Sequence, residues 1–189
     1  MVKDFILASQ SPQRKALLEQ MKFSPKKILP ADIDETPKLQ EKPSQYVKRM
    51  ALEKAQKVFS SNKGQVVLAS DTIIVCGTKI IQKSKTDDEQ AKVMRLLSGK
   101  THRVMTAVCV IDREGKTSVR LNTTKIKMKR LTEKEISDYV SSKEWVGCAG
   151  YKIEGEIAAF VKQIIGSTSG VIGLPLYETR LLLIGAGVE

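Results

Sequence analysis

The chain has 189 residues, of which 41% are hydrophobic and 28% charged, a composition typical of globular proteins. No apolar run approaches the ~20 residues of a membrane-spanning helix, and three widely spaced cysteines make no disulfide or zinc pattern, so we expect a cytoplasmic protein without membrane partners. The formal net charge of +11 favours anionic partners, although scattered lysines are more often a solvated surface. Because aromatic residues make up only 5%, no stable nucleic-acid partner is expected.

The first predicted elements are a strand, a serine-rich turn and a helix. Residues 5–8 form the short buried strand, and Ser11 caps a helix over residues 12–21. Free N–H groups at the start of a helix attract anions, and Ser9 and Arg14 add further donors. This pattern predicts a phosphate site, with an ordinary capped helix and a surface arginine as the equal alternative.

An acidic loop and a second helix follow a short strand at residues 28–29. Residues 32–35 contain three acids between prolines, which is typical either of a Mg²⁺ site or, more often, of a solvated loop. Ser44 is predicted to cap a helix that ends near residue 60. Lys54 interrupts the apolar stripe of that helix, so its ammonium either turns out to solvent or reaches into a site.

The central stretch, residues 66–83, is predicted as a buried strand followed by a hairpin. Asp71 is its first charge and stands where the first strand is expected to end, and Lys83 follows the hairpin. An unpaired buried carboxylate costs several kcal/mol, so Asp71 needs a place at a cleft mouth or a partner such as a metal-bound phosphate.

The remaining elements alternate, which predicts an α/β protein with a mixed sheet, formed as one domain over residues 1–189. The single histidine, His102, is expected to be structural. The predicted elements are helices over 87–97 and 133–140, capped by Thr86 and Thr132, strands over 100–111, 117–129 and 157–161, a turn at 167–170 and a final helix over 177–184.

Several stretches, in the order in which they occur along the chain, resemble the motifs of the Maf family of nucleoside triphosphate pyrophosphatases, a family first named for an association with septum formation. The similarity covers nearly the whole chain, and the ordered set of motifs is far more specific than any one of them. The stretches are LASQSPQR at 7–14, IDE at 33–35, ASDTII at 69–74 with Lys83, SGKTHRVMTA at 98–107, AGYKIEG at 149–155 and VIGLP at 171–175.

The resemblance implies an elongated α/β fold with a cleft between two lobes, and hydrolysis of a nucleoside triphosphate to the monophosphate and diphosphate. It also implies a divalent metal, Mg²⁺ or Mn²⁺, and homodimers are common in the group. The residues that carry over are Ser9 and Arg14 on the triphosphate, Glu35, Lys54 and Lys83 around the cleft, and Asp71 as proton acceptor. Glu35 and Asp71 are also the expected metal ligands, and Asp71 acts either as base or as ligand alone.

Three departures from the family pattern bear on the substrate. Gln13 replaces an arginine and weakens one phosphate or base contact, and Ser84 replaces a proline after Lys83, which predicts a less rigid loop. Glu154 replaces the glutamine of pyrimidine-preferring members, in a segment one residue shorter than usual. A carboxylate only accepts hydrogen bonds, so Glu154 predicts a guanine-like base, such as that of 7-methylguanosine triphosphate, with dTTP and UTP next.

The alternative is a non-catalytic nucleotide or nucleic-acid binding protein linked to cell division. Acids such as Glu35 and Asp71 beside the cations would weaken a pure anion binder, which favours the enzyme.

Overall fold

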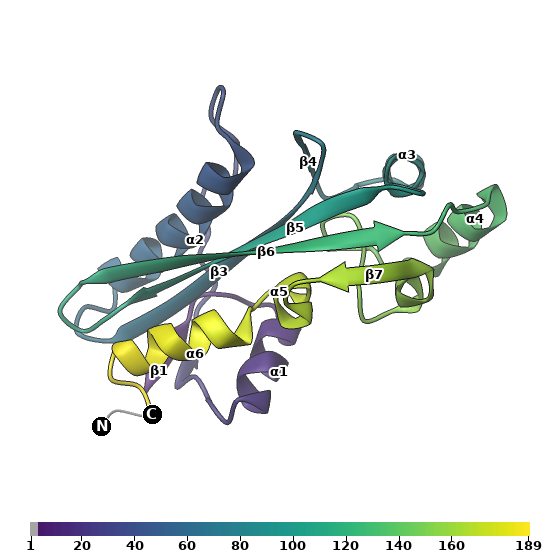
Figure 1. The fold of residues 1–189 in the computed structure, drawn as a ribbon. Helices are drawn as coiled ribbons and strands as arrows, with labels where there is room; N and C mark the ends of the chain where they lie inside the picture. Colours follow the sequence, from purple (N-terminus) through teal and green to yellow (C-terminus); the bar gives the residue numbers. More distant parts are fainter. Residues whose placement is uncertain (1–3) are drawn as a thin grey trace.

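The computed structural model describes residues 4–189, in which one seven-stranded mixed sheet runs in the order β2-β1-β3-β5-β6-β7, with β4 paired to β3. The molecule is elongated along the three long central strands (Figure 1). The strands are β1 (Phe5–Leu7), β2 (Lys27–Ile28), β3 (Val66–Cys76), β4 (Lys79–Ile81), β5 (Thr101–Ile111), β6 (Thr117–Met128) and β7 (Val161–Ile165). The helices are α1 (Pro12–Gln20), α2 (Pro43–Ser60), α3 (Asp87–Leu97), α4 (Glu133–Ser142), the 3₁₀ helix η1 (Glu156–Phe160), α5 (Thr168–Ile172) and α6 (Leu176–Gly185). None of the helices within 4–189 is both long and apolar enough to cross a bilayer.

Strand β3 is shared by both ends of the molecule. On one edge its first residues pair in parallel with β1 and its last residues pair antiparallel with β4, whereas the other edge pairs with β5 almost throughout. Between these partners, residues 69–73 have no strand beside them on the β1 and β4 edge in the described structure. The prediction that the strand ends at Asp71 is wrong, because the sheet continues through that residue to Cys76.

The side chains of β3 alternate between two faces of the sheet, as the strand geometry requires. Val67, Ala69 and Ile73 pack beneath α2 on one face. Val66 and Leu68 pack against α1 and α6 on the other face (Figure 1). Asp71 therefore belongs to the α2 face, inside an otherwise apolar row, and is only 8% exposed.

A separate hydrophobic core lies at the far end of the sheet, among β4, α3, α4 and the segment before β7. The predicted strand over 157–161 is wrong, since residues 156–160 form η1 and the strand β7 begins only at Val161. Ile157 is fully buried and Phe160 is half-buried, while Ala158 and Ala159 between them are exposed. This spacing of three suits a 3₁₀ helix rather than the period of two of a strand.

The helix caps show which local signals were sufficient. Ser11, Thr86 and Thr132 each accept a hydrogen bond from the backbone N–H three residues on, as predicted. Ser44 does not cap α2, because Pro43 occupies the first helical position and leaves Lys42 as the N-cap residue. The turn predicted at 167–170 is instead the start of α5, which Ser167 caps.

Candidate active site

A cleft of about 940 Å³ opens beside the part of β3 that lacks a neighbouring strand, and residues 71–74 line it. Its walls come from both ends of the molecule. Seven of the eight predicted site residues line this cleft, namely Gln13, Arg14, Glu35, Lys54, Asp71, Lys83 and Glu154. Ser9, the eighth, is buried beneath it and accepts a hydrogen bond from Arg14 Nη1 at 2.9 Å. The chain thus gathers predicted site residues that are up to 141 positions apart in the sequence, from Gln13 to Glu154, into one crevice.

Two carboxylates share one ammonium group on the floor of the cleft. Lys54 Nζ lies 2.6 Å from Asp71 Oδ1 and 2.7 Å from Glu35 Oε1. The Lys54 and Asp71 side chains are 12% and 11% exposed, whereas Glu35 is 48% exposed. Of the two alternatives for Lys54, the structure shows the one in which the side chain reaches into a site.

The cationic side chains near Glu35 favour its ionised form. Partial burial alone would raise its pKa, but the hydrogen bond and charge of Lys54, with the charges of Lys83 and Arg14, hold the pKa below its ordinary value. The loop is fixed by Tyr46, whose hydroxyl donates to the Glu35 carbonyl at 2.8 Å. Glu35 therefore belongs to the cleft, whereas Asp32 and Asp34, the other two acids of the loop, are exposed.

Arg14 is turned into the cleft and held from behind. Its Nε donates to the Gly173 carbonyl at 3.0 Å, and the Ser70 hydroxyl donates to the same carbonyl at 2.9 Å. Gly173 has a φ of 130°, a conformation that favours glycine. Burial lowers the pKa of Arg14, and the nearby charges of Asp71 and Glu35 partly oppose that shift. The surface-arginine alternative is thus excluded.

The first helix places its own N-terminus toward the same cleft. Ser11 Oγ accepts from the Arg14 backbone N–H at 3.4 Å and donates to Gln13 Oε1 at 3.1 Å. Ser11 and Gln13 both line the cleft, where the positive end of the α1 dipole adds to the charge of Arg14.

Lys83 and Glu154 form the opposite wall. Lys83 makes an isolated antiparallel bridge with Ala149, which brings the end of the β4 hairpin against the segment that carries Glu154. Burial and Glu154 raise the pKa of the Cys148 thiol, while Lys152 and Lys83 act against them. Lys83 is thus part of this wall, and its charge also helps to lower the pKa of Glu35 in the acid cluster.

Glu35 and Asp71, the two predicted ligands of a divalent metal, both line the cleft. Within residues 4–189 no group of three or more His, Cys, Asp or Glu side chains could hold a metal ion. Mg²⁺ is commonly bound by one or two carboxylates, with phosphate oxygens and water completing its shell. Glu35 and Asp71, which sit on a common ammonium group, match that smaller set of ligands.

Sequence reasoning missed the residues that hold the site in place. Tyr46 lies in the apolar stripe of a predicted helix, and Ser70 is simply adjacent to Asp71 in the sequence. Neither pattern indicated a supporting role, because the hydrogen-bond partners of both residues are distant in the sequence. His102 is buried, as expected of a structural residue. Its Nε2 lies 2.6 Å from the Tyr151 hydroxyl, and burial lowers the pKa of His102 to about 4.

A family model and two similar curated relatives indicate one family. The family model described as "Maf-like protein" matches residues 4–186. A protein of Zymomonas mobilis named dTTP/UTP pyrophosphatase is 46% identical over 99% of this chain and 93% of its own length. A protein of the same name from Mesorhizobium japonicum is 44% identical, over 100% and 94%. Among solved structures, the Staphylococcus aureus Ham1 protein is 13% identical, with a TM-score of 0.49 over 66% of this chain and 71% of that one.

Proposed function

The chain belongs to the Maf family and is a nucleoside triphosphate pyrophosphatase, and we propose that it hydrolyses dTTP and UTP with the help of a divalent metal, Mg²⁺ or Mn²⁺. Water attacks the α-phosphorus, and the products are the nucleoside monophosphate and diphosphate. The observation that carries this proposal is the acid pair on Lys54, which faces Arg14 and Lys83 across one cleft.

Each group has a role that its position supports. Arg14, Lys83 and the N-terminus of α1 neutralise the triphosphate, which lowers the barrier to attack on a polyanion. Asp71 orients the water and takes its proton, while the hydrogen bond from Lys54 holds the Asp71 carboxylate in place. Glu35 and Asp71 would hold the metal, which supplies further charge neutralisation to the phosphate oxygens.

The proposed base is a pyrimidine, in place of the guanine-like base predicted from Glu154. Several relatives at 43–46% identity bear the name dTTP/UTP pyrophosphatase, and this shared name is the support for a pyrimidine substrate. Glu154 is compatible with a pyrimidine, because uracil and thymine carry an N3–H group that can donate a hydrogen bond to a carboxylate. The absence of the usual glutamine then alters how the base is held, not which class of base enters.

Diphosphate release tests the proposal directly. We expect turnover of dTTP and UTP at rates well above those of 7-methylguanosine triphosphate, with Mg²⁺ or Mn²⁺ present, and none in EDTA. Asp71→Asn should lower kcat by about 10²-fold or more, the range for loss of a general base, and leave nucleotide binding measurable. A preference for the methylated guanine nucleotide would refute the pyrimidine proposal, and full activity in EDTA would refute the metal.

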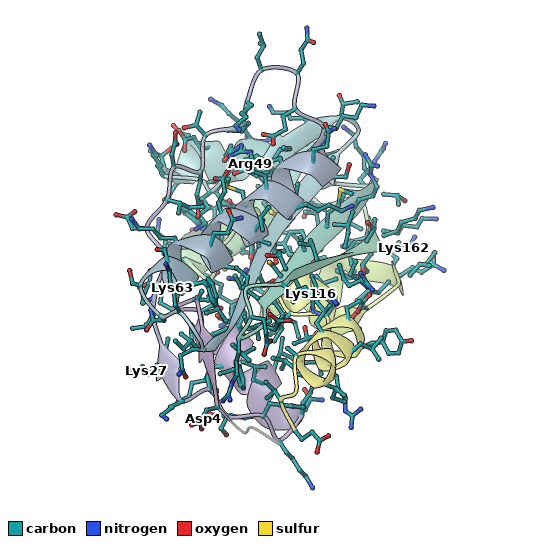
Figure 2. The ribbon with its side chains drawn as sticks, turned by 90° about the vertical axis from the view of Figure 1, so that its left-hand side faces the viewer. Asp4, Lys27, Arg49, Lys63, Lys116 and Lys162 are labelled. Atoms are coloured by element: carbon teal, nitrogen blue, oxygen red, sulfur yellow. The ribbon has the colours of Figure 1, made fainter. Side chains whose placement is uncertain are left out.

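A binding protein without activity is the second candidate, and the surface charge gives it little support. Lys27, Lys63, Lys116 and Lys162 project from well-separated parts of the surface and do not gather into one stripe (Figure 2). If the wild-type chain and Asp71→Asn both bound nucleotide and neither released diphosphate, the binding role would replace the enzymatic one. A homodimer and a cytoplasmic location stay predictions.

A further inference from the structure

Gln90 is a fully buried polar residue on the apolar side of α3. It shares that side with Met94 and Leu97, which belong to the far core and are also fully buried. A buried amide costs free energy unless its hydrogen bonds are made, so its presence in this row calls for a physical reason.

The Gln90 amide makes two hydrogen bonds to two different segments of the wall that carries Lys83 and Glu154. Its Oε1 accepts from the Ser84 hydroxyl at 2.9 Å, next to Lys83. Its Nε2 donates to the Gly150 carbonyl at 2.6 Å, in the segment that leads to Glu154. One side chain thus joins the end of the β4 hairpin to the opposite segment, directly behind the bridge between Lys83 and Ala149.

The segment on the far side is held rigidly enough for such a contact to matter. Gly150 has a φ of 78°, and a Cβ there would come within 2.9 Å of Ile74 Cδ1. The next residue, Tyr151, contacts His102, and the Lys152 N–H donates to the Tyr139 hydroxyl at 3.2 Å. Gln90 therefore ties the stretch around Lys83 to a segment that is held by several contacts.

We infer that Gln90 is a positioning residue, which sets where the Lys83 ammonium stands relative to the triphosphate by tying Ser84 to Gly150. The inference rests on the proposed function for its kinetic consequence. It also explains how this chain manages without the proline expected after Lys83, since the Ser84 hydroxyl supplies by hydrogen bonding the restraint that a proline ring would supply covalently.

Amide hydrogen exchange of the ligand-free protein tests the tie without reference to activity. The variant Gln90→Met keeps the side-chain volume and removes both hydrogen bonds. We expect exchange at residues 82–85 and 148–151 to speed up by about tenfold or more, with α6 unchanged. Thr179→Val is the matched control, because Thr179 is equally buried, donates to the Pro175 carbonyl at 2.7 Å and lies on α6, which lines no part of the cleft. Unchanged exchange in both cleft segments of Gln90→Met would overturn the inference.

A double-mutant cycle tests the link to Lys83. We expect Gln90→Met to lower kcat/KM for dTTP about tenfold in the wild-type chain, and less than about twofold when Lys83 is already alanine. Thr179→Val should change kcat/KM in neither background. Equal losses in both backgrounds, or no loss, would show that Gln90 does not act through Lys83 and would overturn the inference.

Ser84→Ala keeps the inference testable if Gln90→Met does not fold. It removes one hydrogen bond at a half-buried position and should lower kcat/KM about threefold, again only when Lys83 is present. An effect independent of Lys83 would count against the inference. If the wild-type chain releases diphosphate from no nucleotide, the proposed function fails, and the exchange of residues 82–85 and 148–151 alone decides the role of Gln90.

Discussion

Replacing Lys54 by methionine should destabilise the protein far more than the loss of one surface charge. The Lys54 ammonium is the shared partner of Asp71 and Glu35, at 2.6 and 2.7 Å. Breaking a buried ion pair costs about 3–5 kcal/mol, because one charge is left in the interior without a partner. Glu35 is half exposed and readily hydrated, whereas the Asp71 side chain is only 11% exposed and is hydrated much less, so we expect about 3 kcal/mol, at the lower end of that range.

Thermal and urea unfolding measure this loss. For a chain of this size about 3 kcal/mol lowers Tm by roughly 6–12 °C. The double variant Lys54→Met with Asp71→Asn should recover to within about 1 kcal/mol of wild type, because no unpaired charge remains. Lys57→Met, at an exposed position of the same helix, serves as the control and should stay within about 0.5 kcal/mol. A loss below about 1 kcal/mol in Lys54→Met, or no recovery in the double variant, would refute the view that Lys54 neutralises a buried acid.

Two further predictions concern acid stability and the support of Arg14. Glu41 receives hydrogen bonds from Arg49 Nε and Nη2, both at 2.7 Å, and this lowers the pKa of Glu41 to about 2. A lowered folded-state pKa adds stability that is present above pH ~4.5 and lost as the pH falls toward 2. The free energy of unfolding of Glu41→Gln in urea should therefore depend less on pH across that range than that of the wild type. Parallel plots of this free energy against pH for the variant and the wild type would contradict the prediction. Gly173→Ala should lower the free energy of unfolding by about 1–3 kcal/mol through backbone strain. It should also lower kcat/KM, because the Gly173 carbonyl orients Arg14. Gly185→Ala, which has open space around the added Cβ, should change neither quantity.

Local signals in the sequence were enough for most elements, whereas the membership of the cleft was predicted from the resemblance to the Maf family. Ser11, Thr86 and Thr132 start helices where predicted, since a cap depends on residues only three positions apart. The strand break expected at Asp71 failed because its partner, Lys54, lies on another element, and a charge that finds a partner need not end a strand. The apolar run at 157–161 was too short for its period to be read reliably.

The supports of the site were beyond what the sequence could predict. Gln90 lies in one helical stripe and Tyr46 in another. Tyr46 donates one hydrogen bond to the Glu35 carbonyl, and Gln90 donates one to the Gly150 carbonyl and accepts another from the Ser84 hydroxyl. Such contacts depend on how the elements pack, which no local pattern records. The motifs carry the groups that touch the substrate, and the fold supplies the groups that hold them.

Because side chains alternate along β3, the position of Asp71 in the strand decides which face of the sheet its carboxylate occupies. Asp71 faces Lys54 on α2, while its neighbours Ser70 and Thr72 face the opposite layer and contact the turns around α5 through Gly173 and Thr106. Deleting one residue between Leu68 and Asp71 would exchange these faces, turning the carboxylate toward the α5 turns and a hydroxyl toward the lysine. A one-residue insertion or deletion in this stretch would therefore separate the Asp71 carboxylate from Lys54 unless a β-bulge absorbed it.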